Sequence, residues 1–105
     1  MTLLAVDIGN TNVTLGLFRD AELAGSWRAT TRAEATPDEV AAQVRELLAL
    51  DDHGTSALTA VAIASVVPPL TETITQFVRR RLQVDPLVVD AAALDGILAI
   101  SIDRP

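Results

Sequence analysis

The sequence predicts an α/β domain built on a mixed β-sheet, and three observations lead to this class. The beginning of the chain holds three largely apolar segments separated by short turns, which is typical of a three-stranded meander. Two later segments carry apolar side chains at helical spacing, and a run rich in Val, Ile and Ala lies between them. Half of the 105 residues are hydrophobic, which is enough for a core. A meander followed by strand–helix–strand units predicts helices packed on the faces of a mixed sheet.

The meander is predicted from three short strands. Residues 2–8 form an apolar run with the length of a buried strand, and residues 13–18 alternate between two faces. Residues 19–22 are a plausible tight turn, and residues 23–29 complete the meander.

The first helix has a clear start. Thr36 is a good N-cap, Pro37 suits the first helical position, and Glu39 completes a Thr-x-x-Glu capping box. The helix should end before residues 51–54. Its apolar face consists of Val40, Val44, Leu47 and Leu48.

The second half alternates between strands and one more helix. Residues 58–67 are almost uninterruptedly apolar, which is typical of a strand covered on both faces. A second helix is predicted over residues 70–82, a short strand over 86–90, and an extended segment over 97–102. The resulting order, β-β-β-α-β-α-β with about five strands in the sheet, is that of the ribonuclease-H-like fold.

Composition excludes several function classes. The formal net charge is −6, whereas nucleic-acid and anionic-membrane binding need a positive field. The sequence has no cysteine, which excludes a disulfide framework and a thiol nucleophile and fits a cytoplasmic protein. No apolar run approaches bilayer length, and the N-terminus lacks the pattern of a signal peptide. We therefore expect neither nucleic acid nor membrane as a partner.

The turn after the first strand, Asp-Ile-Gly-Asn-Thr-Asn, has two interpretations. Gly and Asn tolerate positive φ, so the composition is also that of an ordinary hairpin. Alternatively, Asp7 at the mouth of a central strand could hold hydrated Mg²⁺, and Gly9 could let the backbone approach a ligand. The amides of Asn10, Thr11 and Asn12 and the Thr11 hydroxyl could then point at phosphate oxygens. The chain contains neither a Walker A loop nor a Rossmann GxGxxG.

Four segments carry a family resemblance. VDIGNTNVTLGLF closely resembles the first phosphate-binding motif of the type III pantothenate kinases, in the acetate kinase/sugar kinase/Hsp70/actin superfamily. SWRATTRAEATPDE resembles the family's Trp-Arg and Thr-x-Asp-Glu segment, and IASVVPPLT resembles its Ser-Val-Val-Pro motif. DRP resembles the segment just upstream of its Gly-Ala-Asp-Arg motif. The resemblance spans essentially the whole chain, in order.

The resemblance implies an activity and a set of ligands. In the family, ATP and pantothenate meet between two ribonuclease-H-like halves, and the γ-phosphate passes to pantothenate to give 4′-phosphopantothenate, the first step toward coenzyme A. It implies Mg-ATP, a monovalent cation (K⁺ or NH₄⁺) and a homodimer. Asp7 would bind Mg²⁺ through water. The positions that would bind ATP phosphates and Mg²⁺ are Asp7, Gly9, Asn10, Thr11, Asn12, Val13, Thr14 and Ser65.

The resemblance also implies a division of the site. Residues 1–90 are expected to form the phosphate-binding domain, and residues 91–105 the start of a connection to a second domain. The family's proposed general base lies in Gly-Ala-Asp-Arg, which is expected downstream of Pro105, so the chain alone is expected to turn over little or nothing. Two alternatives remain: a non-catalytic nucleotide-sensing or regulatory paralogue, and a structural module that pairs through an exposed sheet edge.

Three other groups of residues have structural interpretations. The arginines at 79–81 are expected in the last turn of a helix, where cations complement the dipole. Asp51, Asp52 and His53 are expected in a solvated loop. Trp27 is predicted to be a packing residue at the sheet edge.

Overall fold

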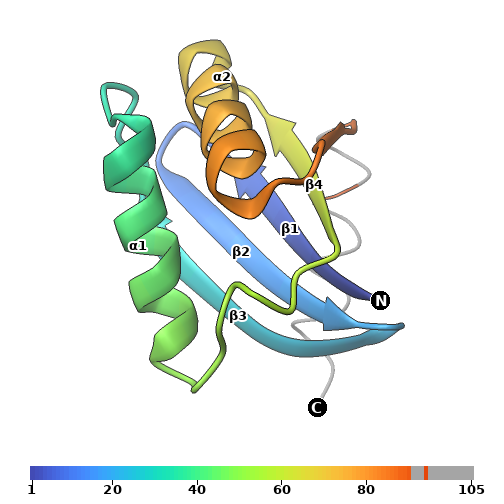
Figure 1. Ribbon diagram of the computed structural model, residues 1–105. Helices are drawn as coiled ribbons and strands as arrows, with labels where there is room; N and C mark the ends of the chain where they lie inside the picture. Colours follow the sequence, from blue (N-terminus) through green and yellow to red (C-terminus); the bar gives the residue numbers. More distant parts are fainter. Residues whose placement is uncertain (91–93, 95–105) are drawn as a thin grey trace.

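The computed structural model describes residues 1–90 and residue 94 (Figure 1). In chain order its elements are β1 (Thr2–Ile8), β2 (Asn12–Arg19), β3 (Glu22–Thr30), α1 (Pro37–Ala49), β4 (Ala60–Ser65), α2 (Pro68–Phe77), the π-helical turn η1 (Val78–Leu82) and β5 (Leu87–Val88).

The five strands form one mixed sheet in the order β3-β2-β1-β4-β5. Neighbouring strands β1, β2 and β3 are antiparallel, as expected for a meander, while β4 runs parallel to β1 and β5 runs parallel to β4. The predicted fold class and element order are confirmed. The central strand β1 therefore has its carboxyl end beside the carboxyl end of β4, and this edge of the sheet carries the β1–β2 hairpin.

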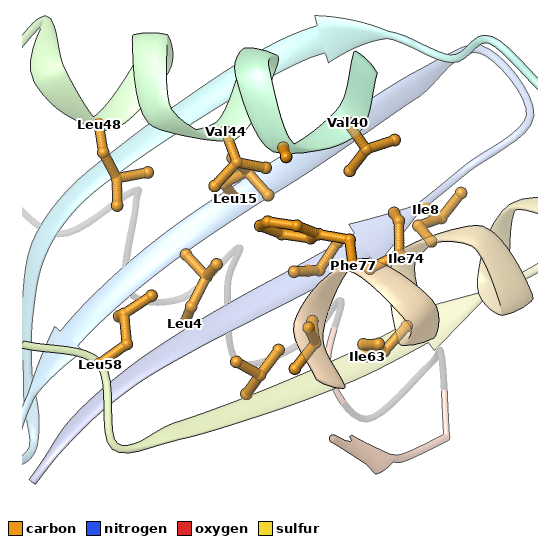
Figure 2. Packing of buried hydrophobic residues seen from close by; sticks show 14 of the residues in the cluster. Leu4, Ile8, Leu15, Val40, Val44, Leu48, Leu58, Ile63, Ile74 and Phe77 are labelled. Carbon is orange, nitrogen blue, oxygen red and sulfur yellow. The ribbon is translucent and has the colours of Figure 1, made fainter. Parts of the chain in front are cut away.

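Both described helices cover the same face of the sheet (Figure 1). Figure 2 shows their apolar side chains meeting those of the strands, with α1 and α2 side by side above β1 and β2. Because strand side chains alternate between faces, every second residue of β1 enters this core. The residues involved include Leu4, Val6, Ile8, Leu15, Leu17, Val40, Val44, Leu48, Val61, Ile63, Leu70, Ile74 and Phe77.

The opposite face of the sheet carries a smaller cluster of buried side chains. A second buried cluster there consists of Ala5, Phe18, Ala64 and Leu94. Neighbours in register on this face include Gly16, the partner of Ala5 on β2. Neither α1 nor α2 packs on this side, where Leu94 is the buried residue that comes from outside the sheet.

The start of α1 is as predicted. The Thr36 hydroxyl accepts a hydrogen bond from the Glu39 N–H (3.2 Å), and a Glu39 carboxylate oxygen accepts one from the Thr36 N–H (3.0 Å). The helix ends at Ala49, just before the loop predicted to stop it.

Element boundaries differ from the prediction in the second half of the chain. The second helix begins at Pro68 rather than at residue 70, because two prolines suit its first turn. Its α-helical part ends at Phe77, and the turn that follows closes at Gln83, whose φ is 56°. The strand predicted over 58–67 is shorter, Ala60–Ser65, and the one over 86–90 pairs only through Leu87–Val88.

The predicted extended segment at 97–102 lies outside the described residues. Within the described part of the chain, no helix is both long and apolar enough to cross a bilayer.

Candidate phosphate-binding hairpin

The β1–β2 hairpin turns tightly at Gly9. The Gly9 N–H donates to the carbonyl of Asn12 at 2.9 Å, and Ile8 and Val13 form the last pair of the ladder. A β-carbon built on Gly9 would lie 3.1 Å from that carbonyl oxygen, closer than ordinary packing allows. The glycine is therefore favoured here by a close backbone approach and not by a positive φ.

Thr31 fixes the hairpin from the end of β3. Its N–H donates to the carbonyl of Thr11 at 2.8 Å, and its Oγ1 donates to the carbonyl of Gly9 at 2.7 Å. Thr31 could not be identified from the sequence, because it lies 22 residues after Gly9 and the contact depends on strand register. The only local indication of this contact in the sequence is the Thr30-Thr31 pair at the end of the third strand.

The tip of the hairpin leaves donors exposed. Asn10 and Thr11 are solvent-exposed, and among the described residues no group accepts a hydrogen bond from either backbone N–H or from the Thr11 hydroxyl. Successive backbone N–H groups without a protein acceptor can bind phosphate oxygens. The hairpin tip can therefore receive an anion.

Asp7 lies two residues before Gly9, on the face of the sheet that the described helices leave open. Its Cα partners are Thr14 on β2 and Ala64 on β4. Strand alternation puts it opposite Val6 and Ile8, which are buried in the main core. Asp7 is half-buried rather than enclosed, so its carboxylate lies outside the main hydrophobic core.

Thr14 and Val13 lie on different faces. Thr14 is the cross-strand partner of Asp7 and shares its face, whereas Val13 packs against the helix-side core. Only Thr14 of these two therefore presents its side chain beside the carboxylate.

Ser65 shares the edge of the sheet with Asp7 but not its face. It is the Cα partner of Ile8, at the carboxyl end of β4. Its Oγ accepts from the Val67 N–H at 2.9 Å and donates to the Val67 carbonyl at 3.1 Å, so the hydroxyl closes its own turn. The α2 N-terminus offers few free donors, because its first two residues are Pro68 and Pro69.

The helix-side face holds a cavity of about 310 Å³ between α1, α2 and the sheet. It is predominantly apolar, with Arg32, Glu39, Gln43 and Glu46 among its polar lining residues. Its floor includes Val6, Val13 and Leu15, which point away from the face of Asp7. The cavity and the carboxylate therefore lie on opposite faces of the sheet.

The hairpin edge could hold a divalent cation only if water and a bound phosphate supplied further ligand oxygens. Among the described residues, no group of three or more His, Cys, Asp or Glu side chains could hold a metal ion. Mg²⁺ is commonly bound through one or two carboxylates, water and substrate phosphates. Asp7 can supply the carboxylate of that set, and the exposed N–H groups of the hairpin can hold the phosphates that supply further oxygens.

The arginines at 79–81 lie in the last turn of η1, and two of them form exposed ion pairs. Arg79 pairs with Asp85 at 3.2 Å, and Arg81 pairs with Asp38 at 2.8 Å across to α1. All four side chains are mostly exposed, so these pairs contribute little to stability. This agrees with the structural interpretation of the arginines.

Sheet order, helix placement and hairpin together define a ribonuclease-H-like α/β domain. A ROK family glucokinase from Streptomyces griseus, solved with glucose and AMPPNP, has the same fold. Its TM-score is 0.56 at 17% identity, and the match covers 86% of this chain and 33% of that one.

The sequence comparisons identify the family. The family model described as type III pantothenate kinase matches residues 3–105. A type III pantothenate kinase from Finegoldia magna is 42% identical over 96 residues, 91% of this chain and 37% of the relative. One from Bifidobacterium adolescentis is 38% identical over 105 residues, 100% of this chain and 41% of the relative. The chain belongs to the type III pantothenate kinase family, and it spans about two fifths of the length of these relatives.

Proposed function

We propose that this chain supplies the ATP-phosphate half of the active site of a pantothenate kinase. The reaction is transfer of the γ-phosphoryl group of ATP to the hydroxyl of pantothenate, which gives 4′-phosphopantothenate. Family membership supports the reaction, and the hairpin with exposed N–H donors beside Asp7 is the observation that supports the half-site.

The hairpin residues bind and orient the phosphates in this proposal. The N–H groups of Asn10 and Thr11 and the Thr11 hydroxyl donate to phosphate oxygens. Gly9 keeps the turn compact, and Asn12 begins the next strand at its base. These fixed donors counter the charge of the phosphoryl group as it moves, which is most of what catalysis of phosphoryl transfer requires.

Asp7 and its neighbours complete the half-site. Asp7 would hold Mg²⁺ through water, and the bound ion would neutralise phosphate charge. Thr14 lies beside Asp7 on the same face and can orient that water, and Val13 fixes the hairpin base from the core side. Ser65 shapes the adjoining strand end through its own turn.

The other parts of the active site and the properties of the whole protein are proposed from the family resemblance. The general base is proposed to lie in a Gly-Ala-Asp-Arg motif outside residues 1–105, because Asp7 cannot easily serve as metal ligand and as base. A homodimer, a monovalent cation (K⁺ or NH₄⁺) and a cytoplasmic location belong to the same proposal, as does the division of the chain into a domain over 1–90 and a connection over 91–105.

The decisive experiment is ATP-dependent phosphorylation of pantothenate by the full-length protein and by its Asp7→Asn variant. We expect activity in the former and a loss of about 100-fold or more in kcat in the variant. Glu72→Gln removes an equal charge from an exposed position on α2 and should leave activity unchanged. An Asp7→Asn variant as active as the unmodified protein would overturn the site assignment. Mg-ATP binding without turnover would favour the nucleotide-sensing alternative.

A further inference from the structure

We infer that Thr31 is a positioning residue that holds the β1–β2 hairpin in the shape that binds an anion. One residue at the end of β3 donates two hydrogen bonds to carbonyls of the turn. Its Oγ1 reaches the Gly9 oxygen at 2.7 Å, and its N–H reaches the Thr11 oxygen at 2.8 Å. The assignment of a nucleotide as the anion rests on the proposed function.

The bond to the Gly9 carbonyl fixes the direction of one proposed donor, the Asn10 N–H, and the bond to the Thr11 carbonyl anchors the tip at a second point. In a trans peptide the carbonyl of one residue and the N–H of the next point in opposite directions. Holding the Gly9 carbonyl toward Thr31 therefore turns the Asn10 N–H away from β3, where no described residue accepts from it. Holding the Thr11 carbonyl fixes the peptide plane that follows Thr11 in the same way.

The hydrogen bond within the turn cannot by itself fix the direction of these donors. Inside the hairpin, the Gly9 N–H to Asn12 carbonyl bond at 2.9 Å closes the turn but leaves the planes at its tip free to rotate. Asn10 and Thr11 are exposed and are not held by packing. Since donors fixed before binding lose less entropy on binding, Thr31 should raise affinity for an anion without touching it.

Substitutions can separate the contribution of the Thr31 hydroxyl from that of its backbone N–H. Thr31→Val keeps the β-branched shape and the N–H to Thr11 but removes the donor to Gly9. Thr31→Ser keeps that donor. Thr30→Val is the matched control, because Thr30 is an exposed neighbour whose hydroxyl makes no hydrogen bond to the described residues.

The kinetic test uses the full-length protein. We expect Thr31→Val to raise KM for Mg-ATP about tenfold, which corresponds to one hydrogen bond. KM for pantothenate should stay within about twofold, as should both constants in Thr31→Ser and Thr30→Val. A structural defect alone would alter both substrates and would not be rescued by Ser. An unchanged KM for Mg-ATP in Thr31→Val would overturn the inference.

Amide hydrogen exchange separates this inference from the proposed function. In ligand-free protein, Thr31→Val should speed exchange of the Gly9 N–H severalfold, while Thr31→Ser and Thr30→Val should match the unmodified protein. If the unmodified protein neither binds nor uses Mg-ATP, the proposed function fails and the exchange result alone decides whether Thr31 holds the hairpin. Unchanged exchange in Thr31→Val would contradict that role.

Discussion

The Trp27 indole N–H donates to a carboxylate oxygen of Asp51 at 2.8 Å. This bond joins the edge strand β3 to the loop that follows α1, 24 residues away. Trp27 is buried, with 7% of its surface exposed, and His53 of the same loop lies edge-on to its ring with centroids 5.8 Å apart. Trp27 is thus a packing residue at the sheet edge, as predicted, and it also holds the loop.

Removing the carboxylate of Asp51 should destabilise the domain. Asp51→Ala leaves the partly buried indole N–H without its acceptor, which costs about 1–2 kcal/mol. Asp51→Asn keeps an acceptor oxygen and should cost less than half as much. Urea denaturation followed by far-ultraviolet circular dichroism measures both. Equal stability of Asp51→Ala and the unmodified protein would show that water replaces the carboxylate at no cost.

Gly25→Ala should displace the same indole ring. A β-carbon at position 25 would lie 2.7 Å from Cη2 of Trp27, so the ring or the strand must shift. We expect a loss of about 1–3 kcal/mol, as for other overpacked sites. The chain has one tryptophan, so its fluorescence emission should also move to longer wavelength.

The matched control for this substitution is Gly54→Ala. A β-carbon there would lie 3.9 Å from the Ser56 Oγ, an ordinary contact, and the change should alter stability by no more than about 0.5 kcal/mol. Equal effects of the two substitutions would indicate that the contact with the indole ring does not explain the cost.

Local signals in the sequence were sufficient for the parts of the fold that depend on near neighbours. The capping box at Thr36 needs only residues three apart, and it is present as predicted. The first strand, Thr2–Ile8, is delimited by its own apolar run and by the glycine turn. The meander and the parallel β4 followed from the order of elements, because few topologies satisfy that order.

Features that depend on register or on distant residues could not be predicted. Nothing in the amphipathic patterns says that α1 and α2 share one face of the sheet. Ser65 was expected among the residues that bind phosphates and Mg²⁺, and the position of its hydroxyl depends on a turn to Val67 that the sequence pattern does not specify. The contacts of Thr31 with the hairpin likewise require the β2–β3 pairing.

Acid should weaken the start of α1 through Glu39. The Thr36 backbone N–H and then its side chain hold the pKa of the Glu39 carboxyl below its ordinary value, and Arg32 adds a smaller effect in the same direction. A lowered folded-state pKa means that the charged form stabilises the fold above the unfolded pKa. This stabilisation is lost as the pH falls from about 4.3 through the lower folded-state value.

The measurement is the free energy of unfolding of the unmodified protein and of Glu39→Gln between neutral pH and pH 3. The difference between them should be largest at neutral pH and should shrink below about pH 4.3. Glu46→Gln removes an equal charge from the same helix away from the cap and is the control. A difference that stays constant with pH would contradict the assignment to the Glu39 carboxylate.

Gly9→Ala should weaken Mg-ATP binding more than it lowers the free energy of unfolding. The added β-carbon would lie 3.1 Å from the Asn12 carbonyl, so the exposed turn must open by a few tenths of an ångström. The turn lies outside the main core, and we therefore expect a loss of stability below about 1 kcal/mol. The donors of Asn10 and Thr11 would move with the turn, and affinity for Mg-ATP should fall about tenfold. Isothermal titration of full-length Gly9→Ala with Mg-ATP, beside Gly54→Ala, measures this effect. Unaltered affinity in Gly9→Ala would mean that the anion does not depend on the shape of this hairpin.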